Sequence, residues 1–170
     1  MVQHTDFDSN YSIRDKLLSA ACARLSVAQT LAEIIEIVRS SARAACSADG
    51  ATFVMRDGNQ CHYVEEDAIA PLWKGRRYPM VHCISGWAML NGKTAVIEDV
   101  FVDPRIPHDV YRPTFVKSLI MAPTCRAQAV AAIGLYWSIR RQFSDHDIRS
   151  AERLAAWVGS AINTVRAAPT

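Results

Sequence analysis

Two long stretches with helical periodicity enclose a middle segment whose pattern is that of β-strands. In residues 31–45 apolar side chains recur at steps of three and four residues, and the same spacing returns in residues 148–165. Between them, short runs of β-forming residues alternate with turn-forming residues, and the Asp57-Gly58-Asn59 turn predicts that the first two runs form an antiparallel hairpin. Helices at both ends of an antiparallel sheet predict an α+β fold, with the terminal helices side by side on one face of the sheet.

Turn and cap residues divide the chain into its expected elements. Ser26 with Gln29 is predicted to form a capping box that opens the second helix, and Ser144 with Asp147 is predicted to open the last one. The expected helices are 13–25, 27–48 (ended by Asp49-Gly50), 84–90 and 144–165. The expected strands are 51–56, 60–65, 94–99, 115–123 and 129–139. Segment 68–80 crosses over with one short strand, and 102–113 is an irregular loop with a helical turn at 108–112.

Composition excludes several classes of protein. Lys plus Arg number 19 against 17 Asp plus Glu, so the net charge of +2 gives no reason to expect nucleic acid or an anionic membrane as partner. The apolar run 129–137 is too short to span a bilayer, and the polar N-terminus carries no export signal. Five cysteines, an odd number, are expected to be free thiols in a reducing cytoplasm.

Several short sequence blocks follow one another in a fixed order: ISGWA (84–88), NGK (91–93), VIEDV (96–100), DPR (103–105), FVKSLIMAP (115–123), AIGLYW (132–137) and FS with D (143–144 and 147). Together they resemble a GAF domain, and the sequence of residues 87–123 is most similar to GAF domains of proteobacterial sensor histidine kinases. The resemblance implies an N-terminal extension and helix over residues 1–26, a GAF-like domain over 27–166 and a tail over 167–170. It also implies a signalling role with a kinase or another output partner.

The second face of the sheet is expected to be covered by the short helix and by loops, which leaves room for a small-molecule pocket. Arg112 and Lys117 would offer positive charge to a small metabolite or nucleotide, and Trp87 and Tyr111 would offer stacking area. Ordinary core packing is the alternative for Trp87 and Phe115. The candidate ligand-binding residues are Trp87, His108, Tyr111, Arg112, Phe115, Lys117, Trp73 and Cys83.

An enzymatic reading is less well supported. The family that the chain resembles includes free methionine sulfoxide reductases, which work through cysteines. Here Ala88 stands at one of the positions where those enzymes carry a cysteine, and residues 101–118, where another is expected, contain no cysteine. A thiol-dependent reductase of small oxidised metabolites is therefore kept only as the alternative, and no catalytic residue is predicted.

Covalent bilin attachment and metal binding are not expected either. Bilin-binding relatives carry a cysteine just before a loop histidine, whereas this chain has Pro107 before His108, and only Cys83 upstream could substitute. Cys61-His62 and His82-Cys83 are adjacent pairs whose side chains point to opposite faces of a strand, so they lack the spacing of a zinc site.

A basic and aromatic cluster lies in residues 73–78. It contains Trp73, Lys74, Arg76, Arg77 and Tyr78. Either this cluster contacts an anionic ligand or a nucleotide base, or it is a solvated loop whose aromatic residues cover the edge of the core.

The terminal helices carry more apolar surface than one sheet face needs. We therefore expect a homodimer that passes signals through these helices. Core packing alone, or a dimerisation module without a ligand pocket, is the alternative. The residues predicted for this surface are Leu31, Ile35, Val38, Leu154, Val158 and Ile162.

Overall fold

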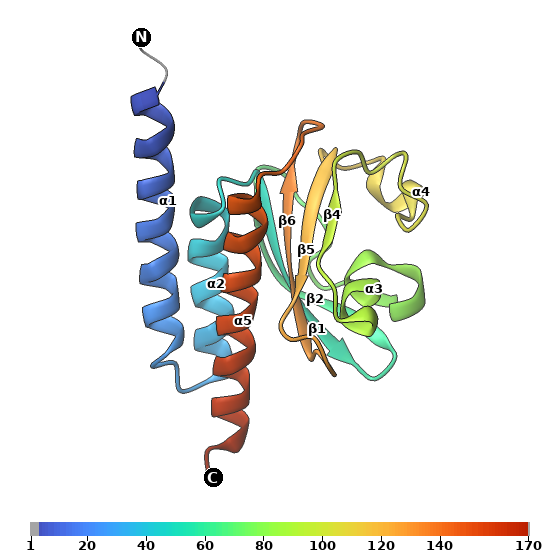
Figure 1. Ribbon diagram of the computed structural model, residues 1–170. Helices are drawn as coiled ribbons and strands as arrows, with labels where there is room; N and C mark the ends of the chain where they lie inside the picture. Colours follow the sequence, from blue (N-terminus) through green and yellow to red (C-terminus); the bar gives the residue numbers. More distant parts are fainter. Residues whose placement is uncertain (1–3, 170) are drawn as a thin grey trace.

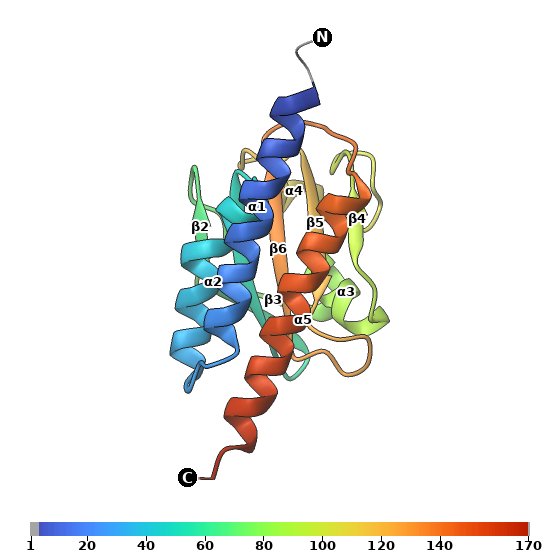
Figure 2. The same ribbon diagram turned by 60° about the vertical axis from the view of Figure 1, so that its left-hand side comes forward.

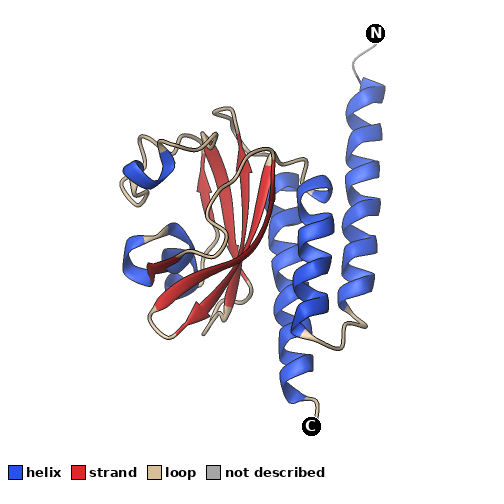
Figure 3. Cartoon of the chain, turned by 180° about the vertical axis from the view of Figure 1, so that it is seen from behind, coloured by secondary structure: helices blue, strands red, loops and turns tan. Residues whose placement is uncertain are grey.

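The structure is a computed structural model that describes residues 4–169, and its elements are stacked in layers. α1 (His4–Leu25) forms an outer layer against α2 (Leu31–Ala45) and α5 (Asp145–Ala167), which cover one face of the sheet (Figure 1). α3 (Ile84–Asn91) and the single turn α4 (His108–Tyr111) lie on the opposite face with their connecting loops (Figure 3). The predicted α+β architecture is confirmed.

The sheet has six strands in the order β3-β2-β1-β6-β5-β4, and every neighbouring pair is antiparallel. Asp57 pairs with Gln60, so the predicted hairpin turns on Gly58 and Asn59 alone. The strands are β1 (Gly50–Asp57), β2 (Gln60–Ala68), β3 (Arg77–Pro79), β4 (Ala95–Ile97), β5 (Ser118–Pro123) and β6 (Ala131–Trp137).

β5 and β6 are shorter than predicted because their expected ends leave the regular ladder. Lys117 N donates to Trp137 O at 2.8 Å, and Val100 N donates to Lys117 O at 2.9 Å, so this backbone is still bonded before β5 begins. At the far end, Thr124 N donates to Ala131 O at 3.0 Å. β-forming composition marks the bonded backbone correctly, but it does not locate where the regular pairing stops.

One of the two predicted helix caps is correct and the other is wrong. Ser144 and Asp147 form the predicted capping box at the start of α5. α2 is capped by Thr30, whose hydroxyl accepts from Glu33 N at 3.2 Å, while Ser26 Oγ donates back to Ala23 O at 2.7 Å. Ser26 therefore belongs to the end of α1, and the Thr30–Glu33 pattern opens the next helix.

The helical layers account for most of the apolar surface that the sequence offered for a dimer. Val38, Leu154, Val158 and Ile162 are buried within the chain, whereas Leu31 is exposed and Ile35 is half-buried. α1 lies between α2 and α5 on the side away from the sheet (Figure 2), and it begins nine residues before the expected start at Ile13. α1 contributes Leu18, Ala21, Cys22 and Leu25 to the same core.

No helix within residues 4–169 is long and apolar enough to cross a membrane. Of the tail expected over 167–170, Ala167 still belongs to α5, and Thr170 lies outside the described residues.

Candidate functional site

The sheet face expected to hold a pocket is filled at its centre by an aromatic cluster of Tyr63, Trp73, Tyr111 and Tyr136. The Trp73 ring lies 4.7 Å from Tyr111, 5.4 Å from Tyr136 and 5.7 Å from Tyr63, measured between ring centroids. All four side chains are buried. Trp73 and Tyr111 are therefore core residues here rather than the walls of an open cavity, because their own rings occupy the space.

A single carboxylate holds Trp73 in this position. Glu66, on β2, accepts backbone N–H bonds from Leu72 at 2.9 Å, Trp73 at 2.8 Å and Lys74 at 2.9 Å. Three convergent N–H donors satisfy the carboxylate and fix the path of the segment after β2. The chain is thereby turned so that the indole of Trp73 points into the aromatic cluster.

Hydroxyl pairs position two of the tyrosines. The Tyr136 hydroxyl lies 2.8 Å from Thr52 Oγ1, and the Tyr63 hydroxyl lies 3.1 Å from Ser85 Oγ. Gly134 makes room for the first pair, because a Cβ at this position would lie 2.2 Å from the Tyr136 hydroxyl oxygen. Burial raises the pKa of Tyr63 and of Tyr136, so these phenols act as neutral hydrogen-bonding groups.

A recess of about 350 Å³ remains beside the aromatic cluster, between the start of α3 and the loop before α4. Two of the predicted ligand-binding residues, Cys83 and Trp87, line this recess. Its lining consists of Val81, His82, Cys83, Trp87, Pro104, Arg105, Ile106 and Pro107.

Arg105 is the cation of the recess. Its guanidinium carbon lies 4.3 Å from the centroid of the Trp87 ring. Asp103 accepts from Arg105 Nε at 3.0 Å and from Nη2 at 2.7 Å, which leaves other guanidinium N–H donors free of that carboxylate. A planar cation stacked on an indole, with unused donors, can bind an anionic or carbonyl group.

His108 and Lys117 do not line the recess, but both contact Phe101 at the start of the loop before α4. His108 Nε2 lies 3.1 Å from Asp103 O, and its ring packs edge-on against Phe101 with centroids 5.9 Å apart. Lys117 Nζ lies 5.1 Å from the centroid of the same Phe101 ring. Both residues support the loop that carries Arg105.

The remaining predicted residues lie elsewhere. Arg112 is exposed and paired with Asp109 on the surface, so it adds no charge to the recess. Phe115 packs beside Gly50, and a Cβ added at Gly50 would lie 2.9 Å from the tip of the Phe115 ring. Sequence reasoning missed Arg105 as a site residue, although its Asp-Pro-Arg motif and its place in the irregular loop could have indicated it.

The basic and aromatic cluster of residues 73–78 does not form a cationic site. Lys74 Nζ pairs with Glu65 at 2.5 Å, and Arg77 pairs with Asp57. Trp73 is turned into the core while Arg76 is exposed. The structure therefore matches the alternative interpretation of a solvated loop over the edge of the core.

A larger groove of about 740 Å³ lies at the β4 edge of the sheet, bordered by the end of α3, the loop after β5 and α5. It brings Lys93 and Arg126 together with Glu152, and the Glu152 carboxylate accepts from Thr94 Oγ1 at 2.8 Å. None of these three charged side chains is buried. The groove is therefore an exposed surface of mixed charge.

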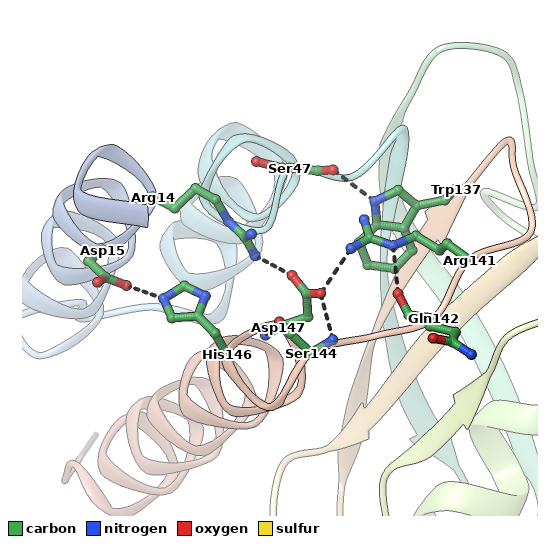
Figure 4. A network of polar contacts seen from close by, with 9 residues as sticks. All are labelled: Arg14, Asp15, Ser47, Trp137, Arg141, Gln142, Ser144, His146 and Asp147. Atoms are coloured by element: carbon green, nitrogen blue, oxygen red, sulfur yellow. Dashed lines mark hydrogen bonds and ion pairs between the residues drawn. The ribbon is translucent and has the colours of Figure 1, made fainter. Parts of the chain in front are cut away.

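A buried ionic junction joins the sheet to α5 and α1 (Figure 4). The Asp147 carboxylate accepts from Arg14 on α1 at 2.9 Å and from Arg141, just after β6, at 2.9 Å. Arg141 also lies 5.1 Å from the centroid of the Trp137 ring at the end of β6. This ionic junction (Arg14, Arg141 and Asp147) is a continuous physical link from the sheet to the outer helix.

Across the described range 4–169, no group of three or more His, Cys, Asp or Glu side chains is placed to hold a metal ion. The Cys61-His62 and His82-Cys83 pairs thus bring no such group together.

Comparison with a family model identifies a GAF domain over residues 30–162. No curated protein matches the sequence of this chain.

Solved structures share the fold at low sequence identity. The GAF domain of a phosphoenolpyruvate-protein phosphotransferase from Coxiella burnetii is 15% identical, with a TM-score of 0.79 over 93% of this chain and 97% of that one. A free methionine-R-sulfoxide reductase from Neisseria meningitidis, in complex with its substrate, is 16% identical, with a TM-score of 0.77 over 92% of each chain. A putative GAF sensor protein from Burkholderia vietnamiensis is 15% identical, with a TM-score of 0.75 over 92% and 98%. Identities this low establish the fold alone.

Proposed function

Because the chain belongs to the GAF domain family, a family of regulatory and sensory modules, we propose that it senses a small molecule bound in the recess between α3 and the loop before α4. The observation that carries this proposal is the Arg105 guanidinium stacked on Trp87 in a concave site. The reductase from Neisseria meningitidis, which holds its substrate on the same fold, supports small-molecule binding by such a domain.

The recess favours a ligand with one anionic or carbonyl group and a compact apolar body. Arg105 supplies the donors, and Trp87, Ile106 and Pro107 supply apolar surface. A small carboxylate or nucleotide-like metabolite therefore fits this chemistry better than a cation. Pro107 precedes His108, so non-covalent binding is favoured over bilin attachment.

We infer that the signal travels through the terminal helices. The recess loop and α3 pack on the sheet, and the ionic junction connects the end of β6 with α5 and α1. A ligand can shift this arrangement only if it binds two positions of these elements with different affinity.

The finer identity of the system belongs to the same proposal. The similarity of residues 87–123 to sensor histidine kinase sequences supports a histidine kinase or another signalling protein as output partner. We also propose the division of the chain into an N-terminal extension and helix (1–26), a GAF domain (27–166) and a tail (167–170). Free thiols at all five cysteines support a cytoplasmic location. Autophosphorylation of sensor kinases from the same host, measured with and without the chain, tests the partner; unchanged rates throughout would count against it.

Native mass spectrometry of the full chain purified from its own host tests ligand binding. We expect extra mass that leaves on denaturation. Arg105→Ala and Trp87→Ala should each lose this mass, because they remove the donor and the stacking surface. Arg112→Ala is the matched control, since Arg112 lies outside the recess and should retain the ligand.

Three outcomes would contradict the proposal. Equal retention by all three variants would place the ligand elsewhere. Mass that survives denaturation together with visible absorption would instead indicate a covalent chromophore. Turnover of free methionine sulfoxide with a thiol reductant, lost in Cys83→Ser, would favour the reductase alternative.

A further inference from the structure

Two buried cysteines belong to the same hydrophobic cluster beside the recess, and the proposed sensory function does not use their chemistry. Cys61 lies on β2 and is fully buried; Cys83 immediately precedes α3 and lines the recess. Cys61 and Tyr63 lie two residues apart on β2 and therefore face the same side of the sheet, where the Tyr63 hydroxyl lies 3.1 Å from Ser85 Oγ. Cys83 Sγ lies 3.4 Å from Ser85 Oγ.

The surroundings distinguish the two sulfurs. The Cys61 thiol, the Ser85 hydroxyl and the backbone N–H groups of Gly86 and Ser85 favour the Cys83 thiolate, and they outweigh burial, so the pKa of Cys83 lies below that of an ordinary thiol. The pKa of Cys61 is raised, because its proton is held by Cys83 and because the residue is buried. Cys83 is thus the better nucleophile, and Cys61 is the neutral thiol beside it.

We propose that Cys61 and Cys83 form an oxidation-sensitive thiol pair, in which a hydroperoxide that enters the recess oxidises Cys83 and Cys61 then closes a disulfide. The proposal stands whether or not the recess also binds a metabolite. Oxidation would tie β2 to the first turn of α3, beside the Tyr63–Ser85 hydrogen bond.

The chemistry balances with the hydroperoxide as the sole oxidant. The Cys83 thiolate attacks one peroxide oxygen, the O–O bond breaks, and the leaving oxygen takes a proton to become an alcohol, or water from hydrogen peroxide. Two electrons pass from sulfur to the peroxide, and Cys83 becomes a sulfenic acid. The Cys61 sulfur then attacks the sulfenic sulfur, the S–O bond breaks, and hydroxide leaves as water with the Cys61 proton.

The other cysteines provide internal controls. Burial raises the pKa of Cys46 to about 12, and burial likewise raises the pKa of Cys22, so both should stay reduced. Cys125 is exposed on the loop after β5, away from the recess. Oxidation of Cys125 could link two chains to each other, but it would not join Cys61 to Cys83.

The test is a thiol map of the reduced full-length chain after treatment with hydrogen peroxide. Remaining thiols are alkylated under denaturing conditions, and the chain is digested with trypsin without reduction. Cleavage at Arg56, Lys74, Arg77 and Lys93 places Cys61 in peptide 57–74 and Cys83 in peptide 78–93. We expect these two peptides to be joined, and dithiothreitol to separate them.

Variants assign the roles of the two sulfurs. Cys83→Ser should lose the linked peptides and leave Cys61 reduced, whereas Cys61→Ser should accumulate a Cys83 sulfenic acid that dimedone captures. Cys125→Ser is the matched control and should form the linkage as the wild type does. If Cys61→Ser or Cys83→Ser does not fold, the thiol map of the wild-type chain still decides whether the disulfide forms.

The proposal would be overturned if Cys61 and Cys83 both remained reduced in the wild-type chain after treatment with peroxide. It would also be overturned by linkage through Cys125 alone, or by a Cys83 sulfenic acid that persists although Cys61 is present.

Discussion

Gly86 shows how a single missing atom allows α3 to lie where it does. A Cβ at this position would lie 1.9 Å from the backbone oxygen of Met80. The obstacle is main chain rather than a flexible side chain, so it cannot move aside without shifting the turn before α3. The glycine of the ISGWA block is therefore required for close packing rather than for a special backbone conformation.

Gly86→Ala is expected to lower the free energy of unfolding by about 3 kcal/mol, the upper end of the usual cost of overpacking. Urea denaturation followed by circular dichroism measures the change. Leu90→Ala, at an exposed position on the same helix, is the matched control and should change stability by less than about 0.5 kcal/mol. Equal losses in the two variants would show that the Met80 contact is not the cause.

Residue-level prediction succeeded where a pattern is local. Ser144 with Asp147 and the Asp57-Gly58 turn are complete within four residues, so the sequence specifies them. Ser26 was the wrong cap because Thr30 with Glu33 offers the same pattern a few residues later, with a charged acceptor. Arg105 could not be ranked above Arg112, because only the folded loop shows that one stacks on Trp87 while the other faces Asp109.

The ionic junction is the feature that matters most at the scale of elements. Burial disfavours the Asp147 carboxylate, but Ser144, Arg14 and Arg141 outweigh that cost, so its pKa lies below the ordinary value of 3.8. A lowered pKa means that the folded state gains stability from this charge above about pH 4. That gain is lost as the pH falls through the folded-state pKa.

Asp147→Asn should reduce the free energy of unfolding by about 3 kcal/mol at pH 7, because two guanidinium groups lose their anion. The difference from wild type should shrink as the pH is lowered from 5 towards 2. Denaturant titrations across this range measure it, with Asp109→Asn as the control on an exposed ion pair. A difference that stays constant with pH would show that the charge of Asp147 is not responsible.

Element-level prediction identified every strand except the bounds of β3, but it did not reveal what α1 covers. The apolar stripe of α2 points partly to the sheet and partly to α1, and periodicity alone cannot separate these two contacts. The aromatic cluster was missed for a similar reason. Whether Trp73 and Tyr111 line a cavity or fill it depends on ring positions fixed by Glu66 and by the opposite strands.

At the scale of the whole molecule, α1 covers the outer sides of α2 and α5 and presents its own outer side to solvent. Ile13, Leu17, Val27 and Leu31 are exposed along α1 and at the turn into α2. Exposed apolar side chains on a helix are a common contact between identical chains. The homodimer therefore remains our prediction, now placed on this surface.

Leu17→Glu should weaken self-association at least about tenfold, because a charge would have to be buried at the contact. Sedimentation equilibrium of the full chain measures the dissociation constant. Leu90→Glu places the same charge on an exposed leucine of α3, across the sheet, and should leave association unchanged. A wild-type chain that is monomeric at high concentration, or equal effects of both variants, would contradict the prediction.

α1 and α5 lie side by side and run in the same direction, and the described chain enters at one end of this pair and leaves at the other (Figures 1 and 2). Tension applied between the two ends would therefore act along the helix axes and slide one helix past the other. Sliding loads the Arg14–Asp147 contact together with the neighbouring His146–Asp15 contact at once, whereas peeling would break contacts one after another. The module is thus built to be stiff along its length and weaker across it.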